Sequence, residues 1–113
     1  MSQILAERNI LYFHFIQPNQ YYPTERVFST EEKKFIIEDN PYAVGVRKGY
    51  PALIYQVNNL QKAKVNVFNA VDIFDEETEI VYRDSCCHYN IIGQKKLDKY
   101  IANSLKPVME KKD

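Results

Sequence analysis

Ile10-Leu11-Tyr12-Phe13-His14-Phe15-Ile16 is the stretch that decides the fold of this 113-residue chain. It is apolar almost without a break and rich in aromatic and β-branched residues. Such a run is typical of a strand that is buried on both faces of a sheet. Gln17-Pro18-Asn19 ends it, because proline lacks the N–H that a strand ladder needs. We therefore predict a strand over residues 10–16 that needs neighbouring strands.

Helical patterns surround this strand. An amphipathic pattern over residues 1–8, followed by Asn9, is typical of the last turns of a helix that is already under way. Ser29 with Glu32 resembles a capping box, which predicts a second helix through about Asp39. The other predicted elements are a helix over 52–62 introduced by Gly49-Tyr50-Pro51, a strand over 65–71, an extended piece over 80–82 and a final helix from Asn90 to about Leu105. Asn40-Pro41 is interpreted as the end of the second helix.

This order predicts one α/β domain over residues 1–113. Strands separated by helices favour parallel pairing, with the helices packed on the sheet. Two strands alone make a poor independent sheet, because both of their edges stay open. We therefore expect a partial three-layer α/β/α domain with few parallel strands, whose sheet lacks strands that these residues do not supply. Open edges also predict self-association into a homo-oligomer.

The charge balance excludes some classes of function. Lys and Arg total 15, and Asp and Glu also total 15, so the formal net charge is zero. A nucleic-acid-binding surface is usually basic and clustered, so no nucleic-acid partner is predicted. No apolar run is long enough for a transmembrane helix, and no signal-peptide pattern is visible. No cofactor is predicted.

The stretch that carries chemistry is Asp84-Ser85-Cys86-Cys87-His88-Tyr89-Asn90-Ile91-Ile92-Gly93. A histidine acts as a general base at neutral pH when another group fixes its tautomer and orientation. Asp84 lies four residues before His88, and on a tight loop it can reach the ring. The alternative is a surface histidine beside a helix cap, with Asp84 as an ordinary loop residue.

Cys86 and Cys87 are the only cysteines, and they are adjacent. On an extended chain their side chains point apart, so we predict reduced thiols that pack as small apolar groups, and a cytoplasmic protein by default. A zinc site with His88 is disfavoured, because zinc motifs usually separate their cysteines. Cys86 as a nucleophile beside His88 is also disfavoured, because it lies on the same loop as the acid and the base.

The segment 82–93 resembles the final conserved block of the SGNH (GDSL-type) hydrolases. Residues 11–21 and Gly49-Tyr50-Pro51 resemble segments of a bacterial branch of that family, so the likeness extends from about Ile10 to Leu105. The resemblance implies a flavodoxin-like sandwich with the site at the carboxyl ends of the parallel strands. It also implies that His88 activates a serine for attack on an ester and that Asp84 orients His88.

The chain departs from this family in two respects. It contains no Gly-Asp-Ser, so the nucleophile block is missing, and the oxyanion glycine and asparagine blocks have no match. The commonest family spacing also places the acid three residues before the histidine, where this chain has Ser85. The first hypothesis is therefore the C-terminal part of a serine esterase or acylhydrolase, inactive alone, whose complete form takes a small ester. The second is a non-enzymatic α/β module that self-associates or docks a partner strand.

Other candidates come from the segment after the predicted strand. Open α/β sheets bind ligands beyond the carboxyl ends of their strands, which makes Gln17 and Asn19 candidate substrate-binding residues. Turn formation and capping are equal alternatives for both. His14 is predicted to be a satisfied core histidine, and Tyr21 and Tyr22 are predicted to pack within the loop.

Overall fold

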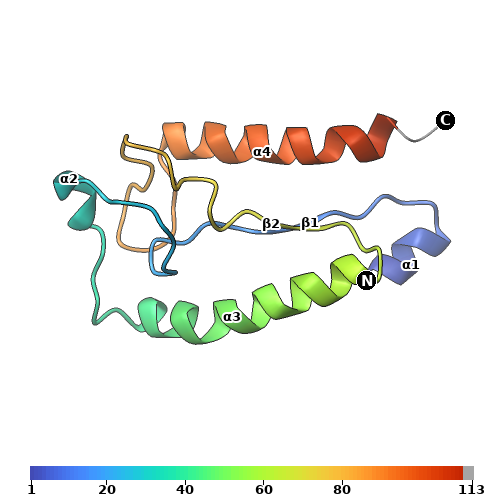
Figure 1. Cartoon of the computed structure of the whole chain (residues 1–113), viewed down its shortest axis with the longest axis horizontal. Coiled ribbons are helices and arrows are strands. Elements are labelled where there is room, and N and C mark those ends of the chain that lie inside the picture. The colour runs from blue at the N-terminus through green and yellow to red at the C-terminus, as the bar shows by residue number, and fades with distance from the viewer. Residues whose placement is uncertain (111–113) are drawn as a thin grey trace.

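The computed structural model describes residues 1–110. Its elements follow one another along the chain as α1 (Ser2–Glu7), β1 (His14–Ile16), α2 (Thr30–Lys33), α3 (Pro41–Lys62), β2 (Val67–Asn69) and α4 (Ile91–Glu110). The two long helices, α3 and α4, lie on opposite sides of the strands (Figure 1).

The two strands pair in parallel, with Phe15 opposite Phe68. On one face of this sheet, Ile16 and Val67 pack against Val57 of α3. On the other face, the ring of Phe15 stacks on Phe68 and meets the edge of Tyr100 of α4, with ring centroids 5.0 and 6.1 Å apart. The chain therefore has the α/β arrangement that the sequence predicts, a parallel sheet flanked by helices.

Helices α1 and α3 end in the same way, with one residue in the left-handed region. Asn9 has a φ of 58° and Lys64 a φ of 63°. At each end the next residue donates its amide back to the last turn, from Ile10 to Leu5 at 2.8 Å and from Val65 to Leu60 at 2.9 Å. These Schellman motifs satisfy carbonyls that a helix end leaves free. Asn9 was predicted as a helix end, and the structure confirms it.

The prediction for Asn40-Pro41 was wrong. These residues start a helix: the side chain of Asn40 accepts from the amide of Tyr42 at 2.8 Å, and Pro41 is the first helical residue of α3. Proline suits that position, because its missing N–H would have no partner there. Gly49-Tyr50-Pro51, predicted to introduce the helix, lies inside α3.

Four other elements differ in length from their predictions. The strand predicted over 10–16 is only His14–Ile16, and β2 is Val67–Asn69 rather than 65–71. The helix predicted from Ser29 to Asp39 ends at Lys33, although its cap is confirmed, since Ser29 accepts from the amide of Glu32 at 3.1 Å. Helix α4 continues past the predicted end at Leu105 to Glu110 and includes Pro107.

A second core lies beside the sheet, around Phe74, Val81 and Tyr82. A buried ion pair belongs to it: Arg26 Nη2 lies 2.6 Å from Glu32 Oε1, and the two side chains are 4% and 1% exposed. The other oxygen of Glu32 accepts from the backbone amides of Val81 and Tyr82 at 2.7 and 3.0 Å. This carboxylate therefore fixes the backbone that leads into residues 84–93.

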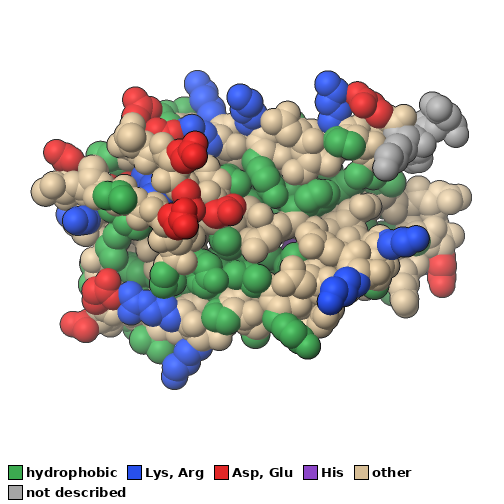
Figure 2. Space-filling model, viewed as in Figure 1, with side chains coloured by type: hydrophobic (Ala, Val, Ile, Leu, Met, Phe, Trp, Pro, Cys, Tyr) green, Lys and Arg blue, Asp and Glu red, His purple; other side chains and the backbone are tan. Residues whose placement is uncertain are grey.

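The molecule is elongated and exposes more surface than a compact domain. Its extents are 49 × 27 × 20 Å, and its accessible surface is 8027 Å², against about 6,500 Å² for a folded monomer of this mass. Hydrophobic side chains lie at the surface among the charged ones (Figure 2). Large exposed ones include Ile4, Ile10, Tyr55, Leu60 and Ile91. No helix within residues 1–110 combines the length and the apolarity needed to cross a membrane.

Candidate active site

The candidate site is a loop closed at its base by backbone pairing. Tyr82 and Tyr89 form an isolated antiparallel bridge, and the amide of Asn90 donates to the carbonyl of Val81 at 2.8 Å. The side chain of Asn90 then accepts from the amide of Gly93 at 3.0 Å, in the first turn of α4. A Cβ atom on Gly93 would lie 2.6 Å from the Val81 oxygen, so glycine allows α4 to start this close to the loop. Residues 83–88 are thus held at both ends.

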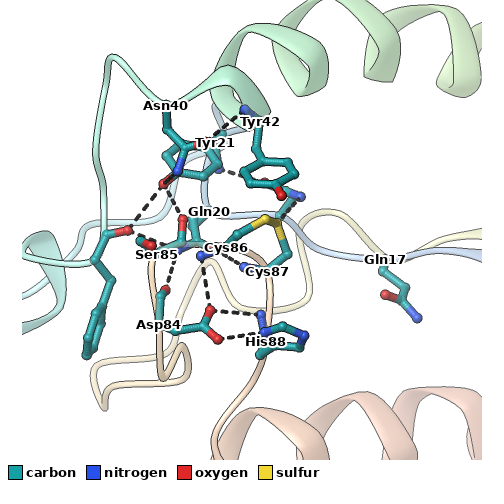
Figure 3. The surroundings of a disulfide bond; sticks show 12 residues. Gln17, Gln20, Tyr21, Asn40, Tyr42, Asp84, Ser85, Cys86, Cys87 and His88 are labelled. Carbon is teal, nitrogen blue, oxygen red and sulfur yellow. Dashed lines mark hydrogen bonds and ion pairs between the residues drawn. A yellow bond between two sulfur atoms is a disulfide. The ribbon is translucent and has the colours of Figure 1, made fainter.

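Asp84 and His88 meet within this loop. The Nδ1 atom of His88 lies 2.6 Å from Oδ2 of Asp84 (Figure 3). The other oxygen, Oδ1, accepts from the amides of Cys86 at 3.0 Å and of His88 at 3.4 Å. One carboxylate therefore both shapes the turn and orients the ring. We call Asp84 and His88 the dyad.

The dyad leaves one ring nitrogen free for chemistry. Desolvation raises the pKa of Asp84, but hydrogen bonds from the His88 ring and from the Cys86 and His88 amides outweigh it and lower that pKa below its ordinary value. At neutral pH the carboxylate is ionised and accepts only, so Nδ1 of His88 must carry a proton. In the neutral ring, Nε2 is then the base. The side chain of His88 is 65% exposed, so another group can reach it.

A groove of about 720 Å³ opens beside the dyad. Its lining includes Gln17, Arg83, Cys87, His88 and Gln94. Gln17 directly follows β1, so the groove lies beyond the carboxyl end of that strand, where the sequence predicts substrate-binding residues. The structure therefore brings Gln17 and His88 to one groove.

Asn19 is placed differently and is not among the residues that line this groove. Its side-chain oxygen accepts from the amide of Tyr21 at 3.0 Å, and its Nδ2 donates to Sγ of Cys87 at 3.5 Å. These contacts match the turn-forming alternative. Its predicted contact with substrate stays a prediction.

Cys86 and Cys87 are joined in a disulfide, so the prediction of reduced thiols differs from the structure. That prediction assumed an extended backbone, on which adjacent side chains point apart. Cys87 instead has a φ of 80°, in the left-handed region. The turn that results places both sulfur atoms on one side of the loop (Figure 3).

His14 is exposed, so its prediction as a core histidine was wrong. It lies on β1 in register with Val67, and its Nδ1 lies 3.4 Å from the hydroxyl of Tyr12. Tyr21 packs against the loop of residues 83–88, and Tyr22 packs against α3 rather than within its own loop. Tyr21 is 2% exposed, and the ring of Tyr22 lies 5.3 Å from that of Tyr50 between centroids.

Two residues that support the site were missed from the sequence, Gln20 and Glu32. Gln20 is buried and bonds to the backbone of the dyad loop, and Glu32 anchors the segment before it. The capping pattern Ser29-Thr30-Glu31-Glu32 identified Glu32, but only as a helix-start residue. Nothing local in the sequence indicates that either side chain reaches residues more than 45 positions away.

No protein-family model, no curated protein and no solved structure matches this chain. Among residues 1–110, no group of three or more His, Cys, Asp or Glu side chains is placed to hold a metal ion. The chemistry open to the site is therefore inferred from the dyad and its groove.

Proposed function

We propose that this chain supplies the general base and its orienting acid to an SGNH-type serine esterase or acylhydrolase site. The observation that carries the proposal is the contact of 2.6 Å between Asp84 Oδ2 and His88 Nδ1, with the rest of the ring exposed at a groove. In serine hydrolases this contact fixes the tautomer and stabilises the imidazolium that forms. The position of the groove beyond β1 supports a flavodoxin-like sandwich with its site at the carboxyl end of the sheet.

His88 would take the proton of a serine hydroxyl through Nε2 and return it to the leaving alcohol. The serine must come from outside these residues. Within residues 1–110 the His88 ring bonds to Asp84 and to no hydroxyl or thiol, and the chain contains no Gly-Asp-Ser. We therefore expect the isolated chain to be inactive on esters.

The unusual spacing of the acid is compatible with this role. Asp84 lies four residues before His88, one more than the commonest family spacing. The left-handed backbone of Cys87 and the two amide bonds to Asp84 Oδ1 tighten the loop enough for Oδ2 to reach the ring. Asp84, rather than Ser85, is therefore the proposed orienter.

The test starts from the coding DNA before the Met1 codon. We expect it to encode a Gly-Asp-Ser segment in frame with this chain. The protein that contains both parts should hydrolyse p-nitrophenyl acetate, and His88→Gln should lower kcat by at least about 10³-fold. Absence of such a segment, or full activity of the His88→Gln variant, would contradict the proposal.

A second candidate function is a non-enzymatic module that self-associates. The observation that favours it is the accessible surface of 8027 Å², about 1,500 Å² more than expected for a folded monomer of this mass. A stable interface needs about 800 Å² from each partner. Sedimentation velocity tests this self-association: a stable dimer of the isolated chain supports it, and a monomer at all concentrations contradicts it.

A further inference from the structure

Gln20 holds both arms of the dyad loop with one side-chain amide. Its Nε2 donates to the carbonyl of Asp84 at 2.8 Å, and its Oε1 accepts from the amide of Cys87 at 2.8 Å. A third bond runs from Nε2 to the carbonyl of Phe35 at 3.1 Å. Gln20 is 5% exposed, so water does not readily replace these bonds.

The side-chain amide of Gln20 forms the same kind of hydrogen bonds with the loop backbone that a neighbouring β-strand would form. It pairs with one carbonyl and one N–H of the backbone, at positions 84 and 87, on either side of the turn (Figure 3). These are the residue that carries the acid and the residue before the base. The distance between the two backbone positions is therefore set by a rigid, planar group.

The neighbouring residue holds the tip of the same loop. The hydroxyl of Tyr21 donates to the carbonyl of Ser85 and accepts from the amide of Ile37 at 3.4 Å. Residues 20–21 directly continue the segment that leaves β1, so the sheet, rather than α4 alone, determines where the dyad lies. Removal of the Gln20 amide would leave a part-buried carbonyl and a part-buried N–H without these partners.

We propose that Gln20 is a positioning residue for the dyad, whose amide fixes the spacing of Asp84 and Cys87 and thereby keeps Nδ1 of His88 on the carboxylate of Asp84. Its significance for catalysis rests on the proposed hydrolase function. Its effect on the geometry of the dyad does not, and can be measured without substrate.

The chain has only two histidines, which makes the measurement specific. Ring ¹⁵N chemical shifts at neutral pH report the tautomer of each histidine, and His14 on β1 serves as an internal reference for the rest of the fold. The variants are Gln20→Leu, which has similar size but no polar atoms, and Gln20→Asn, which is one methylene shorter. Gln56→Leu, at an exposed position of α3, is the matched control.

We expect His88 of the wild-type protein to be a single Nδ1–H tautomer, and Gln20→Leu to shift it toward a mixture with the Nε2–H form. His14 should not change, and Gln56→Leu should leave both rings unchanged. A folded Gln20→Leu protein with an unaltered His88 tautomer would overturn the proposal. If that variant does not fold, Gln20→Asn decides by the same criterion.

A measurement on the wild-type protein completes the test and needs no variant. The Cys87 amide, as the donor to Gln20, should exchange with solvent at least about tenfold more slowly than the neighbouring amide of Ser85, for which the structure shows no acceptor. Equal exchange of the two amides would overturn the proposal. None of these measurements involves ester hydrolysis. The positioning role of Gln20 can therefore be confirmed or contradicted independently of the proposed hydrolase function.

Discussion

At the scale of the residue, the carboxylate of Asp84 has three hydrogen-bond partners: two backbone amides that shape its loop, and the ring of the proposed base, His88. Its Oδ1 accepts two amides of its own loop and its Oδ2 accepts from His88. The acid therefore cannot be removed without loosening the loop that holds the base. This coupling makes the protonation of Asp84 visible in the stability of the folded chain.

Asp84→Asn should change how stability depends on pH. The pKa of Asp84 is lower in the folded chain than its ordinary value of about 3.9. Ionised Asp84 thus stabilises the folded state fully above that ordinary value, and the contribution disappears as the pH falls through the folded pKa. We expect urea unfolding to show wild type more stable than Asp84→Asn at pH 6, with the difference shrinking below about pH 4.

Asp39→Asn is the control for this measurement, because Asp39 is exposed and lies outside the dyad loop. It should not reproduce the pattern. A difference between wild type and Asp84→Asn that stays constant from pH 6 to pH 2 would contradict the role given to the Asp84 carboxylate.

Gly93 and Gly45 should respond oppositely to alanine. A Cβ on Gly93 would lie 2.6 Å from the Val81 oxygen, whereas one on Gly45 meets nothing within 4 Å. We expect Gly93→Ala to lower the free energy of unfolding by about 2 kcal/mol, because the first turn of α4 must move. Gly45→Ala, inside α3, should raise it by about 0.5 kcal/mol. Equal effects in chemical denaturation would contradict the packing described here.

Single residues were predictable where the signal is local. The pattern Asp84 to His88, the caps Ser29 and Asn90, and the helix end at Asn9 can be identified from a few neighbouring positions. The contacts of Gln20 and Glu32 with residues 81–87 could not, because those partners are 49 to 67 residues away along the chain. Tertiary contact determines how those two side chains support the site.

At the scale of the element, the Arg26–Glu32 pair connects α2 to the segment before the dyad loop. Glu32 belongs to a helix of only four residues, yet it bonds to the amides of Val81 and Tyr82. The guanidinium of Arg26 lies 4.7 Å from the ring centroid of Phe28. The main role of this short helix is therefore to place the Glu32 carboxylate against the amides of Val81 and Tyr82.

Glu32→Gln should be strongly destabilising. The neutral amide leaves Arg26 as a buried charge without its partner, and one-sided removal of a buried pair costs about 3 kcal/mol or more. Glu31→Gln, the exposed neighbour in α2, should change the free energy of unfolding by less than about 0.5 kcal/mol. Thermal unfolding of the two variants provides the comparison, and similar melting temperatures would contradict the account.

Element boundaries were less predictable than element types. An Asn-Pro pair is found both where helices end and where they begin. At residues 40–41 it begins a helix, because the side chain of Asn40 caps the amide of Tyr42. The apolar run over 10–16 predicts a longer strand than β1, because β2 pairs with only three of its residues. Strand length depends on the partner, which a local pattern does not contain.

At the scale of the whole molecule, the chain is an α/β arrangement with a small sheet. Its Cα radius of gyration is 15.9 Å, against about 13 Å for a compact domain of this length. Helices α3 and α4 are longer than the strands they cover, and extend beyond the two-stranded sheet (Figure 1). The general class followed from the alternation of strands and helices, whereas the extent of the sheet did not.

Small-angle X-ray scattering tests this shape. At concentrations where the forward scattering corresponds to one chain, we expect a radius of gyration of at least 15.9 Å, because the two long helices extend past the sheet. A value near 13 Å, expected for a compact domain, would contradict the elongated arrangement.

The most direct test of the central claim is the ring ¹⁵N spectrum of His88 at neutral pH, in the wild-type protein and in Asp84→Asn and Ser85→Ala. We expect an Nδ1–H tautomer in wild type and in Ser85→Ala, and its loss in Asp84→Asn, because Asp84 Oδ2 is the acceptor at 2.6 Å. An Nε2–H tautomer in wild type, or one that Asp84→Asn leaves unchanged, would contradict the claim.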